Sequence, residues 1–219
     1  MKDDRTTLQK YFPQAAVDAI LSSLTEKNIL LRFSKSRASK LGDYRPALKG
    51  KPHRISLNHD LNPYEMLITY VHELAHLYAF EKYGRKHQPH GMEWKKFFGE
   101  LMQPYLAIPL FPQDVTQELR EYLYVSKAAN GSDINLRRVL HNYNQRVASN
   151  SFTVETLPEK SLFQVADGRV FQKLEQRRKR FKCLCMNDNR FYLFSPLAVV
   201  VPFDGQNANQ SLYLTKKIG

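Results

Sequence analysis

His72-Glu73-Leu74-Ala75-His76 is the stretch of sequence that most constrains the fold. Residues four apart on an α-helix lie on one face, about one turn from each other, so His72 and His76 can reach the same metal ion. Glu73 follows the first histidine, where its carboxylate can accept a proton from water whose pKa a bound zinc ion lowers to roughly 7. The segment therefore predicts a zinc-hydrolase site on a helix.

The surrounding sequence predicts a helix over about residues 62–83. Asn62 is a suitable N-cap, and Pro63 suits the first helical position. Apolar residues then recur at spacings of four, three and four, namely Leu67, Val71, Leu74 and Tyr78. This is the helical period, and Gly84 is a plausible helix end. Both histidines are thus expected near the middle of a helix with an apolar face for the core.

A catalytic zinc ion takes three protein ligands and keeps a fourth position open. We select His90 as the third ligand because Gly91 allows a tight turn after it. A second helix is expected to follow, carrying Met92, Trp94, Phe97, Phe98, Leu101 and Met102. His87 is the alternative. The metzincin arrangement is excluded because Lys82 occupies the position of its third histidine, whereas Glu81 and Glu93 remain open as carboxylate ligands.

Together these motifs resemble the SprT-like zinc metallopeptidases, the SprT/Spartan type. HExxH on a long helix is followed by a short loop and by His90-Gly91-Met92-Glu93-Trp94, which opens another helix. Upstream, residues 37–44 resemble the family's arginine-leucine-glycine segment, and Arg54-Ile55-Ser56-Leu57 resembles the edge strand before the active-site helix. The resemblance covers about residues 10–105. Beyond it, the general layout is most similar to the SprT-like proteins of Bacteroidetes.

The resemblance implies a zincin-like fold in which His72, His76 and His90 bind one Zn²⁺ and Glu73 is the catalytic acid/base. It also implies DNA-associated protein substrates, including proteins crosslinked to DNA. The expected mechanism is metal-assisted peptide hydrolysis. Zinc would polarise the scissile carbonyl and activate water, and Glu73 would move the water's proton to the leaving amine. A donor to the developing oxyanion is needed as well. The sequence leaves five candidates open: Tyr64, Tyr70, Tyr83, Tyr105 and Arg37.

The fold class predicted is α+β. Residues 1–150 are expected to form a zincin-like catalytic domain in which strands at 29–33 and 53–57 accompany a helix at 13–25. Helices at 114–125 and 134–143 are expected to flank it. Residues 151–206 are predicted to form a small, basic antiparallel β domain, because short apolar segments alternate there with turn signals. Residues 207–219 read as a polar, poorly ordered tail.

The two cysteines, Cys183 and Cys185, lie one residue apart in a predicted strand. Some relatives carry a zinc ribbon in this region, but a structural zinc site needs four ligands and only two thiols are present. We therefore expect both cysteines to be small core residues. Their scarcity excludes a disulfide framework and favours a reducing compartment.

The formal net charge is +12, with 33 Lys and Arg against 21 Asp and Glu. Such a surplus favours a polyanionic partner, and the family resemblance implies that this partner is DNA. The densest basic cluster consists of Lys173, Arg177, Arg178, Lys179, Arg180 and Lys182. Aromatic residues are interleaved with it: Phe171, Phe181, Phe191, Tyr192 and Phe194. Either these residues contact phosphates and bases, or the aromatics fill a β core and the cations form its solvated edge. We expect the aromatics to be mostly core.

No apolar run is long enough for a membrane span, and residues 1–5 lead into a polar segment rather than a signal-peptide core. We expect a cytoplasmic, monomeric enzyme without membrane contact. Two alternatives remain open. One is a nucleic-acid-binding protein with a vestigial zincin scaffold, and the other is a zinc hydrolase whose substrate is not protein.

Overall fold

The computed structural model describes residues 2–37, 39–48, 50–86, 88–125, 132–144 and 152–204. The chain divides into two compact units, Met1–Gln145 and Arg146–Gly219, which we describe separately. Helices and two sheets make up the described residues, so the predicted α+β class is confirmed. The predicted polar tail at 207–219 lies outside the described residues.

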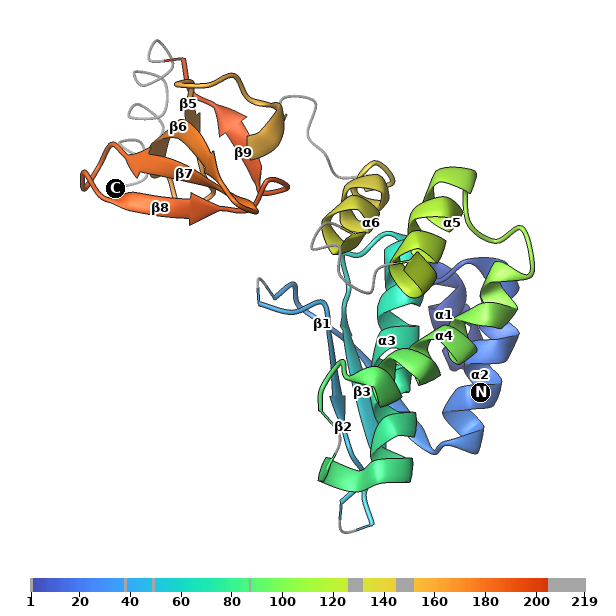
Figure 1. Ribbon diagram of the computed structural model, residues 1–219. Coiled ribbons are helices and arrows are strands. Elements are labelled where there is room, and N and C mark those ends of the chain that lie inside the picture. The colour runs from blue at the N-terminus through green and yellow to red at the C-terminus, as the bar shows by residue number, and fades with distance from the viewer. Residues whose placement is uncertain are drawn as a thin grey trace. The chain divides into compact units, whose positions relative to one another are not determined.

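The first unit combines a three-stranded sheet with helices (Figure 1). In chain order its elements are α1 (Lys2–Tyr11), a 3₁₀ turn (Gln14–Ala16), α2 (Val17–Glu26), β1 (Ile29–Ser34), β2 (Gly42–Arg45), β3 (His53–Asn58), α3 (Pro63–Tyr83), a second 3₁₀ turn (Gly84–Lys86), α4 (Met92–Leu106), α5 (Gln113–Arg120), a π-helix (Glu121–Val125) and α6 (Ser132–His141).

β3 is the central strand of this sheet, not the edge strand that the family resemblance implies. It pairs with β1 in parallel and with β2 in antiparallel fashion, so the strand order is β1-β3-β2. Ile55 and Leu57 of β3 are fully buried, as the period-two alternation of a half-buried strand requires. The edge strand that contacts α3 is β2, a short strand that begins with Gly42 and was not predicted.

α3 is the central element of the core. Asn62 caps it as predicted, since its Oδ1 accepts hydrogen bonds from the backbone N–H of Tyr64 (3.1 Å) and Glu65 (3.0 Å). Pro63 begins the helix, and Gly84 ends it at φ 63°, a conformation that glycine adopts without strain. α3 contacts β2 and β3 as well as α4. Because it is covered on several sides, its buried apolar residues exceed the single stripe read from the sequence.

Other helix boundaries differ from prediction in small ways. The predicted helix at 13–25 is a 3₁₀ turn followed by α2, and α1 was not predicted because its sequence is mostly polar. α1 is nonetheless held to the core by Leu8, which is 2% exposed. α5 begins one residue before Asp114, whose carboxylate still accepts the Val115 N–H at 2.8 Å.

The second unit is a six-stranded sheet in which every recorded pairing is antiparallel, as predicted. Its strands are β4 (Phe152–Thr153), β5 (Leu162–Gln164), β6 (Val170–Arg177), β7 (Arg180–Cys185), β8 (Phe191–Phe194) and β9 (Val199–Pro202), in the order β4-β9-β5-β6-β7-β8. Phe163 and Phe171 stack in its core. Cys183 and Cys185 are buried free thiols in the same core, which confirms their predicted role.

Among the described helices, none is both long and apolar enough to cross a membrane.

Candidate metal centre

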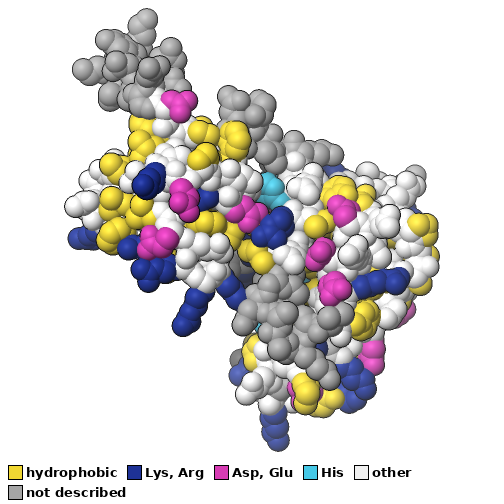
Figure 2. Space-filling model, turned by 45° about the horizontal axis from the view of Figure 1, so that its top comes forward, with side chains coloured by type: hydrophobic (Ala, Val, Ile, Leu, Met, Phe, Trp, Pro, Cys, Tyr) yellow, Lys and Arg dark blue, Asp and Glu magenta, His cyan; other side chains and the backbone are white. Residues whose placement is uncertain are grey.

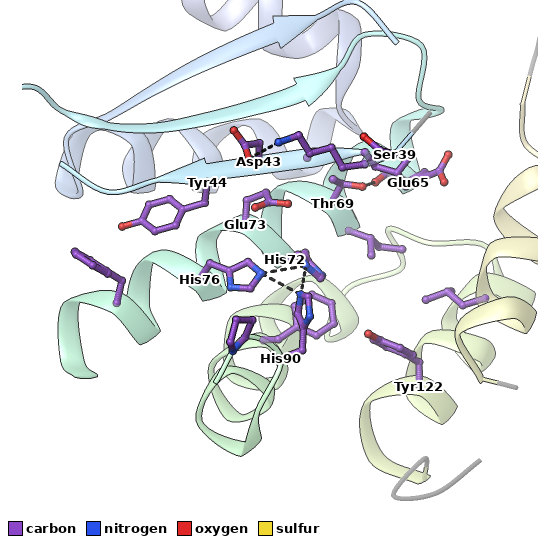
Figure 3. A pocket seen from close by; sticks show the side chains of 18 of the residues that line it. Ser39, Asp43, Tyr44, Glu65, Thr69, His72, Glu73, His76, His90 and Tyr122 are labelled. Atoms are coloured by element: carbon purple, nitrogen blue, oxygen red, sulfur yellow. Dashed lines mark hydrogen bonds and ion pairs between the residues drawn. The ribbon is translucent and has the colours of Figure 1, made fainter. Parts of the chain in front are cut away.

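Three histidine side chains converge on one point (Figure 3). His72 and His76 project from α3, and His90 projects from the turn before α4. The Nε2 atom of His90 lies 3.0 Å from that of His72 and 3.1 Å from that of His76, and the two helix histidines are 3.3 Å apart at the same atoms. In the described part of the chain these three residues form the group suited to hold a metal ion.

This arrangement fits a zinc ion. Zn–N bonds of about 2.0–2.1 Å at tetrahedral angles place two ligand nitrogens about 3.4 Å apart. The three Nε2 separations are 3.0–3.3 Å, close to that value. Two of the imidazoles favour the neutral form that binds a metal: burial, with the charges of His76 and His90, lowers the pKa of His72 to about 3. Burial lowers the pKa of His90 as well. Neutral rings at neutral pH can bind a metal without first losing a proton.

Trp94 packs against all three histidines. Its indole N–H donates a hydrogen bond to the backbone carbonyl of His72 at 3.3 Å. Its ring centroid lies 4.5 Å from that of His72, 5.4 Å from that of His76 and 4.8 Å from that of His90. Trp94 is only 1% exposed and stacks on Phe98 of the same helix. The tryptophan thus fixes the third histidine, which comes from a loop, against the two on α3.

The loop that carries His90 has an unusual backbone. His90 has φ 59°, in the left-handed region that non-glycine residues seldom adopt. Gly91 follows in an extended conformation as the N-cap of α4, and a Cβ atom on it would lie 3.0 Å from the carbonyl oxygen of Gln88. A residue held in a sparsely populated conformation is common at functional sites. Gly91 therefore provides the tight turn that the sequence predicts.

Glu73 lies next to the histidines but points from α3 toward β2 (Figure 3). Its carboxylate is close to Gly42, where a Cβ atom would be 2.5 Å from Glu73 Oε1. The side chain is 7% exposed. Burial and the nearby charge of Asp43 raise the pKa of Glu73 to about 7, although Arg37 and Lys40 act in the opposite direction. A carboxyl group with a pKa near neutrality is suited to both accept and donate a proton.

A cleft of about 900 Å³ opens over these groups. On one side it is lined by Leu41, Gly42, Asp43 and Tyr44 around β2, and on the other by Leu136, Arg137 and Leu140 of α6. All three histidines and Glu73 line it. The chain therefore places a potential metal site and a carboxylate of raised pKa inside a space large enough for an extended peptide or a comparable substrate.

A known protein family matches part of the chain. The model of the SprT-like family matches residues 8–116, about half of the chain, and these residues include the three histidines and Glu73. The chain belongs to the SprT-like family. No curated protein and no solved structure gives a significant match. The matched region ends within α5, so the second unit lies outside the part of the chain that the SprT-like model covers.

The other ligands considered from the sequence of this SprT-like chain are less suitable or lie outside the described residues. Glu81 forms an ion pair with Lys27, at 2.7 Å. Glu93 lies in the first turn of α4 and is not part of the group of potential ligands found among the described residues. His87 is not among the residues that the structure describes, so the choice of His90 rests on its convergence with His72 and His76.

Lys173 is a correction to the predicted basic cluster. It is 4% exposed, and its Nζ donates hydrogen bonds to the backbone carbonyls of Glu155 (3.1 Å) and Leu157 (2.5 Å). The reason is strand alternation, since position 173 faces the core like Phe171. Its cross-strand neighbour is the buried Cys183. Lys173 is therefore a buried structural residue and does not belong to an exposed nucleic-acid face.

The remaining cations are more accessible. Arg177, Arg178, Lys179 and Arg180 are exposed around the turn between β6 and β7, and Arg178 there has φ 51°. Lys182 is half-buried, with its Nζ 3.9 Å from the ring centroid of Phe191. Phe191 is 60% exposed, whereas Phe171 is buried and the other three aromatics of the region are partly buried. Figure 2 shows basic and hydrophobic side chains beside one another on the surface it presents. Most of the aromatics are thus core, as expected.

Proposed function

We propose that this SprT-like chain is a zinc metallopeptidase with a zincin-like core. The observation that carries the proposal is the convergence of the Nε2 atoms of His72, His76 and His90 within 3.3 Å of one another, in a cleft that also contains Glu73. Three imidazoles are the donor set of a catalytic zinc site that leaves one position open. The cleft supplies space for a substrate at that position.

The chemistry divides between the ion and the protein. When bound, zinc acts as a Lewis acid that polarises a carbonyl group and makes water more acidic. Glu73 accepts a proton from the attacking water and delivers it to the nitrogen of the leaving amine, so that the C–N bond breaks and the carboxylate is regenerated. Its raised pKa suits both transfers. Trp94 keeps the histidines in position and shields one side of them from water.

β2 offers a means to hold the substrate. In the described part of the chain β2 pairs with β3 alone, and Leu41 to Tyr44 line the cleft. An edge strand can add an extended peptide through main-chain hydrogen bonds, which do not depend on the peptide's sequence. Binding of this kind favours a protease with broad specificity. It would also orient the peptide along the cleft, past Glu73 and the histidines.

The proposed substrates are proteins associated with DNA, including those crosslinked to it. The net charge of +12 and the exposed Arg177, Arg178, Lys179 and Arg180 support a nucleic-acid partner, with Lys182 beside the exposed ring of Phe191. Clustered cations bind phosphates by releasing counterions, and an exposed ring can stack on a base. A cytoplasmic location and a monomeric state remain predictions.

The test uses the full-length, zinc-loaded chain and a DNA-binding protein crosslinked to an oligonucleotide. We expect cleavage of the protein, loss of cleavage with a chelator, and recovery when zinc is restored. The same protein without DNA serves as the comparison for substrate choice. Equal cleavage rates with and without DNA would contradict the proposed preference for DNA-associated substrates. Absence of cleavage in both arms would contradict peptidase activity.

A nucleic-acid-binding protein with a vestigial zincin scaffold is the alternative, and the exposed cations around the β6-β7 turn are the observation in its favour. Zinc binding alone requires neither Glu73 nor the absence of a side chain at Gly42. Both are present, and the carboxylate occupies the space that a Cβ atom would need. A chain that binds nucleic acid and zinc but hydrolyses nothing would support the alternative.

A further inference from the structure

The proposed reaction needs a donor for the negative charge that develops on the scissile carbonyl oxygen. None of the five candidates read from the sequence lines the cleft of the described residues. The Tyr70 hydroxyl is buried, 2.6 Å from Ser23 Oγ, and Tyr105 is buried as well. Arg37 hydrogen-bonds to Asn58 and Ser56 of β3. The two others face elsewhere, since Tyr64 packs on Phe111 and Tyr143, and Tyr83 packs on Phe97.

Two tyrosines do line the cleft, and they point in different directions (Figure 3). The Tyr44 side chain extends away from the histidines, and its hydroxyl lies 2.9 Å from His53 Nδ1. The side chain of Tyr122 comes from the opposite side of the cleft, and its hydroxyl points toward His72 and His90. Tyr122 is therefore the cleft tyrosine whose O–H faces the place where a substrate carbonyl would bind.

The surroundings of Tyr122 fix this orientation. Its ring packs edge-on against Phe98, with centroids 6.1 Å apart. Phe98 stacks on Trp94 and contacts the ring of His72, so an unbroken set of aromatic contacts joins Tyr122 to the histidine cluster. Tyr122 also lies in a five-residue π-helix that follows α5. π-helical turns are rare and occur often at functional sites, because they change where side chains point relative to an α-helix.

We propose that the Tyr122 hydroxyl donates a hydrogen bond to the oxyanion that develops on the scissile carbonyl oxygen, which makes Tyr122 a catalytic residue. This rests on the proposed peptidase function. The proposed step leaves the phenolic proton on Tyr122, because the hydroxyl acts only as a hydrogen-bond donor. The bond is stronger in the transition state, where the oxygen carries negative charge, than with the neutral carbonyl. It therefore acts on kcat more than on KM.

The test compares Tyr122→Phe with Tyr124→Phe in the zinc-loaded, full-length chain. Both substitutions remove one hydroxyl from the same π-helix, but Tyr122 lines the cleft, whereas Tyr124 is not among the described residues that line it. Loss of one oxyanion donor lowers kcat by about 100-fold to 1,000-fold. We expect that loss in Tyr122→Phe, with KM and zinc content close to wild type, and wild-type kinetics in Tyr124→Phe.

A second measurement separates catalysis from a structural role. A phosphinic peptide mimics the tetrahedral transition state, and we expect its affinity for Tyr122→Phe to fall in parallel with kcat. If kcat of Tyr122→Phe equals that of wild type, or if only KM rises, the assignment of Tyr122 is wrong while the peptidase function stands. If the wild-type chain itself cleaves nothing, the proposed function fails and the role of Tyr122 fails with it.

Discussion

Gly42 and Glu73 fit together so closely that a Cβ atom on the glycine would lie 2.5 Å from the carboxylate oxygen Oε1 and 2.7 Å from Cγ. Real Cβ atoms do not approach other atoms to this distance, so any side chain at position 42 must displace Glu73. The backbone of β2 thus defines where the proposed acid/base lies. Gly42 has no side chain that could take part in the reaction, but its close contact with Glu73 makes it important for the proposed catalysis.

Gly42→Ala is expected to move Glu73 and lower kcat/KM by about 100-fold, the effect of roughly an ångström of misplacement. Zinc content should not change, because the three histidines come from α3 and the turn before α4. Overpacking should lower the free energy of unfolding by about 1–3 kcal/mol. Steady-state kinetics, metal analysis and urea denaturation measure these three quantities.

Gly99→Ala is the matched control. No heavy atom lies within 4 Å of a Cβ placed on Gly99, which is in α4. The substitution should raise the free energy of unfolding by about 0.5–1 kcal/mol, because alanine favours the helix over glycine. Equal effects of the two substitutions on kcat/KM would contradict the account of Gly42.

Zinc binding is expected at one ion per chain, with loss in His72→Ala, His76→Ala and His90→Ala. His59→Ala is a control, because His59 is exposed and hydrogen-bonds to the Ser34 carbonyl away from the cleft. His87→Ala should also retain the metal, and the reverse result would make His87 the third ligand. Free zinc at a hundredfold excess over its Kd should stabilise the fold by about 2.7 kcal/mol, measurable as a chelator-sensitive shift in Tm.

Asp43→Asn is expected to shift the acidic limb of the pH–kcat/KM profile to lower pH. Glu73 must be a carboxylate to accept a proton, so activity falls as the pH falls through its pKa. In the wild type, burial and then Asp43 raise that pKa to about 7. The substitution removes the neighbouring negative charge and releases Lys40 from its ion pair, and both changes lower the pKa of Glu73. If the acidic limb stays in place or moves to higher pH, the charge of Asp43 does not raise the pKa of Glu73.

Substitution of Lys173 is expected to change protein stability, whereas substitution of the exposed cations is expected to change DNA affinity. Lys173→Met leaves the carbonyls of Glu155 and Leu157 without their donor and should lower the free energy of unfolding by about 1–3 kcal/mol. Its effect on DNA affinity should be small. The double substitution Arg178→Gln and Lys179→Gln should instead preserve stability and reduce the slope of log K against log salt by up to about 2. Fluorescence anisotropy with a labelled oligonucleotide, at several salt concentrations, measures this slope.

The parts of the fold that could be predicted are those encoded locally. Asn62, Pro63 and Gly84 mark the ends of α3, and the apolar period marks its buried face. The unpredicted β2 is different. Its sequence, Gly42-Asp43-Tyr44-Arg45, has little strand propensity, and it is a strand because it pairs with β3. This pairing depends on the packing of β3 with α3 in the assembled core, so the sequence of β2 alone does not predict it.

The same division applies to the site. The spacing of His72 and His76 specifies their shared helix face, and Gly91 indicates the turn at His90. The contact of Gly42 with Glu73 and the approach of Tyr122 depend on tertiary structure, so local pattern does not reveal them. Lys173 was predictable in principle, because it shares the alternation of Phe171. Its position among several other cations favoured a surface prediction instead.

The most direct test of the central claim is a comparison of wild type and Glu73→Gln, each loaded with one zinc ion per chain, by mass spectrometry of the products from a protein crosslinked to DNA. For the wild type, the account predicts peptide products whose two new termini together carry the atoms of one water molecule, OH on the new carboxyl group and H on the new amine. It predicts at least a 100-fold lower rate for Glu73→Gln at equal zinc content. Equal rates for the two proteins would contradict it.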